Sequence, residues 1–415
     1  MSKTRIAILG VVCVAACGGE SSGRSKYCPV PVDRTDASTV GSDLNVVAVT
    51  VDPGPENIGY TDGLFVSVTL CIPGTTTCNT IDHMLVDTGS VGVRVLETAI
   101  GLTLPAATNA SDVALAECTP FVGGTSWGPL KLADVQVGGK SASSLTVQII
   151  GVTTYAMPSN CTGTPVNDLK TLAANGIFGL GTHLQDCGQP CAEPISSGFN
   201  PGLYYDCAIP SACALAAVPV AEQVSHPVSR FPVDNNGVVI RLPSLPEGGL
   251  FSTSGQLVFG IGTQTNNALG SATVFPLDGF GFISTTFRVG GTSYEAYLDS
   301  GTNGLFFLDE ATADLKRCAG NDSAFYCPAT TANLTATVSA DNGSSAVVDF
   351  RVANMANLDP CLFAFDDLAG PMPGFPTNAN VPGFDWGLPF FFGRNVYVAI
   401  ESPNTATGTG PFFAF

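Results

Sequence analysis

The sequence contains few charged residues. Only 12% of its 415 residues are Asp, Glu, Lys or Arg, and 34 acidic residues outnumber 16 basic ones. Proteins that bind nucleic acids or anionic headgroups present a basic face. With a formal net charge of −18, this chain is therefore not expected to bind nucleic acid. We attribute the acidity to solubility.

Histidine is also scarce. His83, His183 and His226 are the only three, and none belongs to a Cys/His cluster with metal-ligand spacing. No Gly-x-Ser-x-Gly elbow with a convincing His partner occurs, which disfavours a serine triad. The Gly-Gly pairs do not form a phosphate-binding loop. We expect neither a metal nor a cofactor.

The sequence lacks a long hydrophobic run. Its longest apolar stretch near the N-terminus, 6–16, is too short to span a bilayer and follows Lys3 and Arg5. The segment Val14-Ala15-Ala16-Cys17, followed by a Gly/Ser-rich stretch, resembles the lipobox of bacterial lipoproteins. This resemblance implies a signal peptide at 1–16, lipid on Cys17 and a flexible tether at 17–44. An ordinary secretory signal is the alternative.

The lipobox resemblance also implies a location. Gly18 rather than Asp after the cysteine permits transfer to the outer membrane in such lipoproteins. The chain would then be an exported outer-membrane lipoprotein whose membrane contact is the anchor at Cys17. The sequence leaves open whether it faces the periplasm or the cell surface.

What the sequence does contain favours β structure. Hydrophobic residues make up 45% of the chain, with 47 Gly and 29 Pro. Short apolar or alternating runs, such as 64–70, 145–150 and 237–242, are separated by turn residues. Helical periodicity is weak, so we predict an all-β protein, with short helices after Leu96 and after Leu308.

Cysteine is plentiful. Of the 14 Cys residues, twelve remain after Cys13 and Cys17 are set aside, and an even number in an exported chain suggests disulfides. Spacing suggests four close pairs, although sequence alone cannot fix connectivity: Cys71 with Cys78, Cys187 with Cys191, Cys207 with Cys213, and Cys318 with Cys327. Residues 183–232, which hold four of these cysteines, are predicted to be a Cys-rich insertion.

Two similar motifs lie 212 residues apart: Asp87-Thr88-Gly89-Ser90 and Asp299-Ser300-Gly301-Thr302. Each follows an apolar strand-like run, and each precedes a hydrophobic-hydrophobic-Gly element, at 177–179 and 391–393. The repeat predicts two similar lobes, an N-terminal lobe at 45–250 and a C-terminal lobe at 251–415.

Two aspartates brought within hydrogen-bond reach cannot both ionise, so they share a proton. The ionised carboxylate can then accept a proton from water, and the protonated one can polarise a substrate carbonyl. Gly89 and Gly301 permit sharp turns and a close backbone approach. The pair therefore indicates hydrolysis of an amide bond.

Nearly all of 45–415 resembles the pepsin family of aspartic peptidases, on the two motifs and on Gly176-Ile177-Phe178-Gly179 and Gly255-Gln256-Leu257-Val258-Phe259-Gly260. The resemblance implies an all-β, bilobal fold with an active-site cleft between two β-rich lobes, in a monomer that takes peptide or unfolded protein. Asp87 and Asp299 would be the catalytic dyad. Thr88 and Ser300 would brace it, and Ser90 and Thr302 would bond the outer carboxylate oxygens.

The stretches 80–87, 260–270 and 384–390 look closer still to a bacterial family of exported proteins of unknown function. The chain also departs from the pepsin pattern at the flap, the hairpin that covers the cleft in that family. The position of the flap tyrosine falls near Phe121, and the position of its supporting tryptophan falls on Arg94. Trp127 lies on the same hairpin and is a candidate to replace the tyrosine.

Three functions follow from these residues. The first is a lipid-anchored aspartic endopeptidase that uses Asp87 and Asp299. The second is a catalytically inactive, pepsin-like surface lipoprotein that binds peptide or glycan, which the departures at Phe121 and Arg94 favour. The third is a structural lipoprotein. If Arg94 points inward, it could also depress the pKa of a carboxylate.

Overall fold

The structure is a computed structural model that describes residues 43–415 except 210, 289, 379–380, 402–403 and 406–407. The predicted signal peptide at 1–16, the lipidation site Cys17 and nearly all of the tether at 17–44 lie outside the described residues. The first strand begins at Val46, next to the expected start of folded structure near Leu44.

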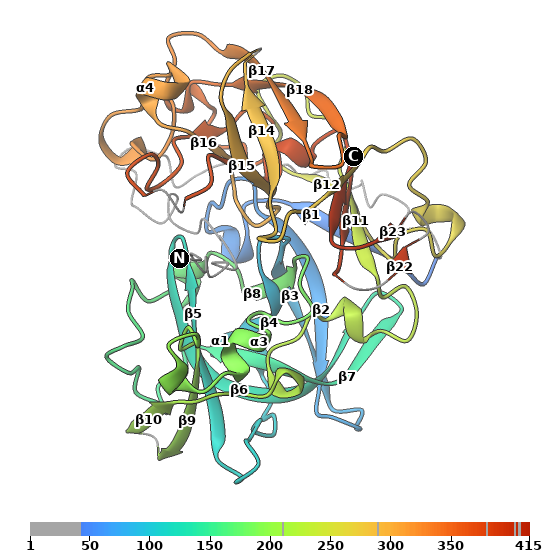
Figure 1. Ribbon diagram of the computed structural model, residues 1–415, viewed down its shortest axis with the longest axis vertical. Coiled ribbons are helices and arrows are strands. Elements are labelled where there is room, and N and C mark those ends of the chain that lie inside the picture. The colour runs from blue at the N-terminus through green and yellow to red at the C-terminus, as the bar shows by residue number, and fades with distance from the viewer. Residues whose placement is uncertain (1–42, 210, 289, 379–380, 402–403, 406–407) are drawn as a thin grey trace.

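The described residues form an all-β protein with two lobes, as the sequence predicted (Figure 1). The strands of the first lobe are β2 (Leu64–Cys71), β3 (Cys78–Asp87), β4 (Val91–Leu96), β5 (Ala114–Phe121), β6 (Gly124–Val137), β7 (Lys140–Ile150), β8 (Gly176–Leu180), β9 (Tyr204–Ile209) and β10 (Ala212–Leu215). Those of the second lobe are β14 (Ile283–Phe287), β15 (Ser293–Leu298), β16 (Leu305–Phe307), β17 (Ala332–Ser339), β18 (Ser345–Val352), β19 (Ala369–Gly370) and β20 (Phe384–Trp386).

A third group of strands lies between the lobes in Figure 1 and joins the sheet of the first lobe. Its members are β1 (Val46–Val51), β11 (Gly237–Arg241), β12 (Thr253–Phe259), β13 (Val274–Pro276), β21 (Asn395–Ala399) and β24 (Phe412–Ala414). The resulting 15-stranded sheet has the order β10-β9-β5-β6-β7-β4-β8-β3-β2-β1-β12-β11-β21-β24-β13. It therefore continues across the boundary predicted between residues 250 and 251.

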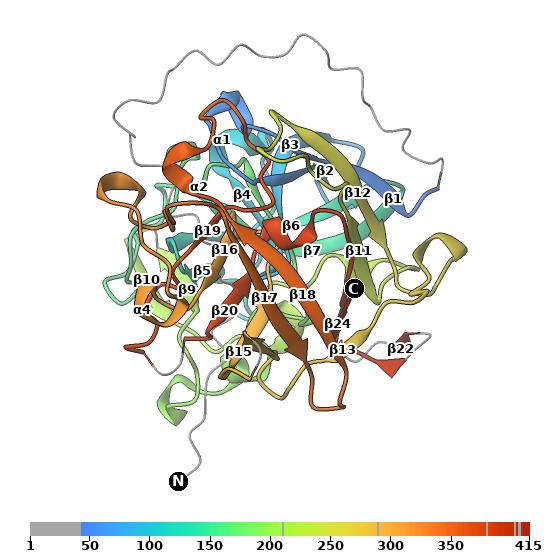
Figure 2. The same ribbon diagram turned by 90° about the horizontal axis from the view of Figure 1, so that it is seen from above.

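The second lobe is a seven-stranded sheet of order β18-β17-β14-β15-β20-β16-β19. Seen from above, the paired strands β17 and β18 run side by side along this lobe (Figure 2). The remaining two strands form a small separate hairpin: β22 (Asn404–Thr405) and β23 (Gly408–Thr409).

Helices are short throughout the described residues. The α-helices are α1 (Glu97–Ile100), α2 (Leu169–Leu172), α3 (Gln189–Ala192) and α4 (Glu310–Ala313). The 3-10 helices are η1 (Pro55–Asn57), η2 (Ile195–Ser197), η3 (Val220–Glu222), η4 (Val228–Arg230), η5 (Thr265–Asn267), η6 (Gly320–Asp322), η7 (Met355–Asn357) and η8 (Leu388–Phe391). The two helices predicted after Leu96 and Leu308 are confirmed as α1 and α4. None of the helices in the described part of the chain is long and apolar enough to cross a membrane.

The main core draws on both lobes and on the central strands. Alternate residues of β2, from Leu64 through Val66 and Val68 to Leu70, are buried in it. This period of two is what a strand with one face on a core requires. The apolar alternation in the sequence therefore fixes which face of the strand turns inward.

The internal repeat is present, but one of its members was assigned wrongly. In the first lobe β3 pairs in parallel with β8, so that Asp87 lies opposite Gly179. In the second lobe β15 pairs in parallel with β20, and the equivalent glycine is Gly387. The predicted counterpart at 391–393 instead begins inside the 3-10 helix η8, whose second residue, Pro389, has no N–H to donate within a sheet.

Between cysteines of the described residues, the disulfides confirm all four predicted pairs and add Cys118–Cys161, which spans 43 residues. Disulfides of this kind persist in oxidising compartments, so they indicate an exported protein. The Cys-rich insertion at 183–232 is not a loose excursion. Its strand β9 pairs with β5, and β10 pairs with β9, so it widens the first sheet.

Candidate active site

The two aspartates are presented by equivalent strand ends at the junction of the lobes. Asp87 is the last residue of β3, and Asp299 directly follows β15. The loops after them are joined by hydrogen bonds across the lobes. The backbone N–H of Ser300 donates to Oγ1 of Thr88 (2.9 Å), and the N–H of Thr88 donates to Oγ of Ser300 (3.2 Å).

Each hydroxyl of this pair also donates to the opposite strand. Thr88 Oγ1 bonds the carbonyl of Leu298 at 3.0 Å, and Ser300 Oγ bonds the carbonyl of Val86 at 2.7 Å. Thr88 and Ser300 are both buried. The brace therefore fixes the position of one aspartate relative to the other.

Gly89 and Gly301 allow the two loops to touch. A Cβ placed on Gly89 would lie 2.4 Å from Oδ2 of Asp299, and one placed on Gly301 would lie 2.6 Å from Oδ1 of Asp87. Both distances are below any van der Waals contact, so each glycine packs directly against the opposite carboxyl group. Any larger residue at these positions would push the aspartates apart.

The carboxyl groups of Asp87 and Asp299 are fully buried and hydrogen-bond each other. The outer oxygens are bonded as predicted from the resemblance: Ser90 donates to Oδ2 of Asp87, and Thr302 donates to Oδ2 of Asp299 at 2.9 Å. The N–H groups of Gly89 and Gly301 each donate to Oδ1 of their own aspartate at 2.8 Å.

The neighbours of the two carboxyls give them different proton affinities. Burial raises the pKa of Asp299 well above its ordinary value, and the neighbouring carboxylates of Asp87 and Asp385 raise it further. Burial also raises the pKa of Asp87, but hydrogen bonds from Ser90, Asp299 and Gly89 and the charge of Arg94 oppose the rise. The pair therefore holds a proton, and Asp299 is the member that favours it.

Arg94 points inward, on β4, but does not lie between the aspartates. Its Nη2 bonds Glu117 Oε1 at 3.1 Å and Asp186 Oδ2 at 3.0 Å, and its Nη1 bonds the carbonyl of Val91. The side chains of Arg94, Glu117 and Asp186 are all buried. Since Glu117 lies on β5 and Asp186 in the Cys-rich insertion, Arg94 ties both elements to the strand beside the dyad.

The β5–β6 hairpin corresponds to the predicted flap. Phe121 ends β5 and is 8% exposed, with its ring centroid 5.8 Å from the guanidinium carbon of Arg94. Val122, in the turn that follows, is 41% exposed. Phe121 thus packs inward, and Val122 forms the accessible tip.

The structure does not place Trp127 at a cleft. Its indole N–H donates to the carbonyl of Tyr155 at 3.0 Å, and its ring packs edge-on against Tyr205 of β9. Trp127 pairs with Cys118, so it lies on the opposite face of the hairpin from Glu117 and Phe121. Side chains alternate between faces along a strand, and Trp127 therefore cannot replace a flap tyrosine.

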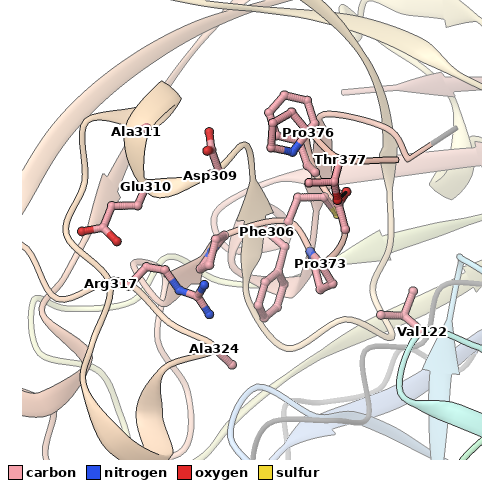
Figure 3. A pocket seen from close by; sticks show the side chains of 14 residues that line it. Val122, Phe306, Asp309, Glu310, Ala311, Arg317, Ala324, Pro373, Pro376 and Thr377 are labelled. Atoms are coloured by element: carbon pink, nitrogen blue, oxygen red, sulfur yellow. Dashed lines mark hydrogen bonds between the residues drawn. The ribbon is translucent and has the colours of Figure 1, made fainter. Parts of the chain in front are cut away.

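A pocket of about 760 Å³ lies between the flap tip and the second lobe. The ring of Phe306 and the guanidinium of Arg317 point into it, and Val122 approaches from the first lobe (Figure 3). Its lining is largely apolar: Val122, Phe306, Asp309, Glu310, Ala311, Arg317, Ala324, Pro371, Met372, Pro373, Gly374, Phe375, Pro376 and Thr377.

Sequence reasoning missed Asp385, a third carboxyl beside the dyad. It lies on β20, is 2% exposed and accepts a hydrogen bond from Tyr297 at 3.1 Å. Burial raises its pKa well above the ordinary value. A register aligned on Gly387 rather than Gly393 would have placed it next to Asp299.

No cluster of three His, Cys, Asp or Glu residues that could hold a metal ion occurs in the described residues.

Comparisons with known proteins give a family without an assigned activity. A family model described as "Protein of unknown function (DUF3443)" matches residues 41–415. Among solved structures, the chain is similar to an aspartic proteinase from Irpex lacteus, with 14% identity and a TM-score of 0.49. That match covers 89% of this chain and 96% of that chain. The comparison with curated proteins gives no match.

Proposed function

The chain belongs to the DUF3443 family of proteins of unknown function, and we propose that it is an aspartic endopeptidase. The observation that carries the proposal is the buried, hydrogen-bonded pair of Asp87 and Asp299, held by matched loops from the two lobes. Two carboxyls that share one proton supply an acid and a base at the same point.

The proton affinities assign the roles. The carboxylate of Asp87 takes a proton from a water molecule while Asp299 donates its proton to the carbonyl oxygen of the scissile bond, which gives a tetrahedral diol. Asp299 then takes back a proton from a diol hydroxyl, and Asp87 donates its proton to the leaving nitrogen as the C–N bond breaks. Asp87 ends ionised and Asp299 protonated, as they began.

The pocket beneath the flap tip suggests the substrate. Phe306, Met372 and Phe375 give it an apolar lining, and Val122 narrows it from the first lobe. A large apolar side chain of an extended peptide would remove this surface from water. We therefore expect cleavage of unfolded protein near such residues, and Val122→Asp should lower kcat/KM about tenfold for them.

The location is part of the proposal. The disulfides indicate an exported chain. We further propose that the protein is monomeric and that lipid on Cys17 anchors it in the outer membrane.

The test compares the wild-type protein with Asp87→Asn and Asp299→Asn on unfolded protein at mildly acid pH. Asn keeps the shape of the side chain but cannot exchange the proton, so both variants should lose activity by at least a hundredfold. The exposed Asp341→Asn serves as the control. If wild type cleaves no faster than either dyad variant, the endopeptidase is excluded.

A second function is favoured by Phe121, which has no hydroxyl at the flap and whose ring is buried. In that case the chain would be an inactive surface lipoprotein that binds peptide or glycan. Such a protein would retain peptides without cleaving them, and a pepstatin-like inhibitor would not affect its role. Cleavage that the inhibitor blocks would rule it out.

A further inference from the structure

The two lobes can be compared position by position around the aspartates. Val86 pairs with Phe178 in the first lobe, and Leu298 pairs with Trp386 in the second. One step back along each strand, Leu85 pairs with Ile177, and Tyr297 pairs with Asp385. The same place therefore holds an apolar pair beside Asp87 and a polar pair beside Asp299.

The apolar pair is ordinary core. Leu85 and Ile177 are both fully buried in one hydrophobic cluster. The polar pair is also buried, with Asp385 2% and Tyr297 8% exposed, and Oδ2 of Asp385 accepts a hydrogen bond from the hydroxyl of Tyr297. Oδ1 of Asp385 has no hydrogen-bond partner among the described residues. Burial makes an anion in this position costly, so the pKa of Asp385 is raised and it ionises only at higher pH than an exposed carboxyl does.

Asp385 is connected to the dyad through Thr302. The hydroxyl of Thr302 donates its only proton to Oδ2 of Asp299. Thr302 also hydrogen-bonds Asp385. This bond lowers the pKa of Asp385, so Thr302 is the donor, and the carboxylates of Asp385 and Asp299 compete for its single proton. The chain of bonds then runs from Tyr297 to Asp385, Thr302 and Asp299.

The next strand shows the same asymmetry. Arg94 of β4 pairs with Ile177, and Phe306 of β16 pairs with Asp385, so Arg94 and Phe306 are equivalent. A buried cation therefore lies on the Asp87 side, and a buried acid lies on the Asp299 side. The charged or titratable groups around Asp385 are Asp87, Asp299 and Tyr297, because β16 presents Phe306.

We propose that Asp385 is a positioning residue that acts through Thr302 to keep the shared proton on Asp299 and leave Asp87 as the base. The inference rests on the proposed peptidase function. The burial and the raised pKa of Asp385 agree with it, as does the further rise that Asp385 causes in the pKa of Asp299. Three interacting carboxyls titrate as a unit, so the effect appears in the limbs of the pH profile.

The experiment is Asp385→Asn in the purified full-length chain. Asn keeps an oxygen that can accept from Tyr297 or Thr302 but cannot ionise. The alkaline limb of the kcat/KM profile should move down by about one pH unit, since a like charge no longer raises the pKa of Asp299. The acid limb should stay in place. Asp341→Asn removes a charge from an exposed turn of the same lobe and should move neither limb.

A second variant gives the second lobe an apolar pair like that of the first lobe. Tyr297→Leu with Asp385→Ile replaces the polar pair by an apolar one and should shift the alkaline limb in the same direction. It also provides a test if Asp385→Asn does not fold. A role limited to packing would lower activity equally at every pH, and an unmoved alkaline limb in both variants would overturn the proposal.

A readout independent of cleavage separates this proposal from the proposed function. In protein labelled with ¹³C at the aspartate carboxyls, the Asp299 signal is identified by its loss in Asp299→Asn. Its titration midpoint should be about one pH unit lower in Asp385→Asn than in wild type. Unchanged midpoints exclude the inference, whereas a shift in a protein that cleaves nothing would reject the peptidase alone.

Discussion

Thr88 and Ser300 hold each other from opposite lobes: each backbone N–H donates to the hydroxyl oxygen of the other residue, and each hydroxyl donates onward to a strand carbonyl. Four buried hydrogen bonds thus cross the junction directly beneath the two aspartates. The brace positions the dyad, and it also contributes to the stability of the whole fold.

The brace gives a first prediction. Thr88→Val keeps the shape but leaves the N–H of Ser300 and the carbonyl of Leu298 without partners. Each buried unsatisfied group costs about 1–3 kcal/mol, so the free energy of unfolding should fall by about 2–6 kcal/mol. Chemical denaturation measures it. Thr88→Ser keeps the hydroxyl and serves as the control; equal losses in both variants would mean that the hydroxyl is not what matters.

The dyad predicts a dependence of stability on pH. The folded-state pKa of Asp299 is raised, so between its unfolded and folded pKa values the folded protein binds more protons than the unfolded one. The free energy of unfolding then falls as pH rises through that window, by up to about 1.4 kcal/mol per pH unit for one proton. Above the folded pKa the loss is complete.

Asp299→Asn removes this dependence. Its Tm relative to wild type should therefore increase from pH 4 towards neutral pH, and its activity should be lost. Thermal melts of the two proteins across this range test the prediction, with the exposed Asp341→Asn as the reference. A constant Tm difference would show that Asp299 does not retain its proton in the folded state.

Local patterns in the sequence predicted much of the fold. The alternation in β2 and the Asp-Thr-Gly-Ser repeat are short-range signals, and both lobes formed as expected around Asp87 and Asp299. The close cysteine pairs are local as well, and all four formed.

The features that were missed depend on contacts distant in sequence. Glu117 and Asp186 come from different elements, and nothing near Arg94 in the sequence identifies them as its partners. Trp127 was misplaced because the face of a hairpin strand that a residue occupies depends on its pairing, here with Cys118. Asp385 was missed because two glycines, Gly387 and Gly393, compete for the same place in the repeat, and only strand pairing decides between them.

The disulfide Cys118–Cys161 gives a third prediction. It closes a loop of 43 residues behind the flap, whereas Cys207–Cys213 closes one of 6. In the chain-entropy model these loops correspond to about 4 and about 2 kcal/mol of stabilisation. Replacing Cys118 and Cys161 by Ala should therefore lower the denaturation midpoint more than replacing Cys207 and Cys213. The reverse order would mean that strain in the folded state, not loop length, controls the effect.

Arg94 gives the last prediction. It is the buried cation for two buried carboxyls, and burial together with the charge of Glu117 raises the pKa of Asp186 well above its ordinary value. Removing one partner of a buried ion pair typically costs about 3–5 kcal/mol because the other charge loses its compensation. Arg94→Met should destabilise the protein by that amount at neutral pH, and adding Glu117→Gln should restore much of it.

The loss in Arg94→Met should shrink in acid, because the stranded carboxylate of Asp186 can take up a proton. Since the charge of Arg94 also lowers the pKa of Asp87, the acid limb of the proposed activity should move to higher pH in this variant. Denaturation at two pH values and a pH–rate profile measure the two effects. Arg94→Lys keeps the charge and serves as the control. If Arg94→Lys loses as much stability as Arg94→Met, the several hydrogen bonds of the guanidinium, and not its charge, hold the flap and the insertion against β4.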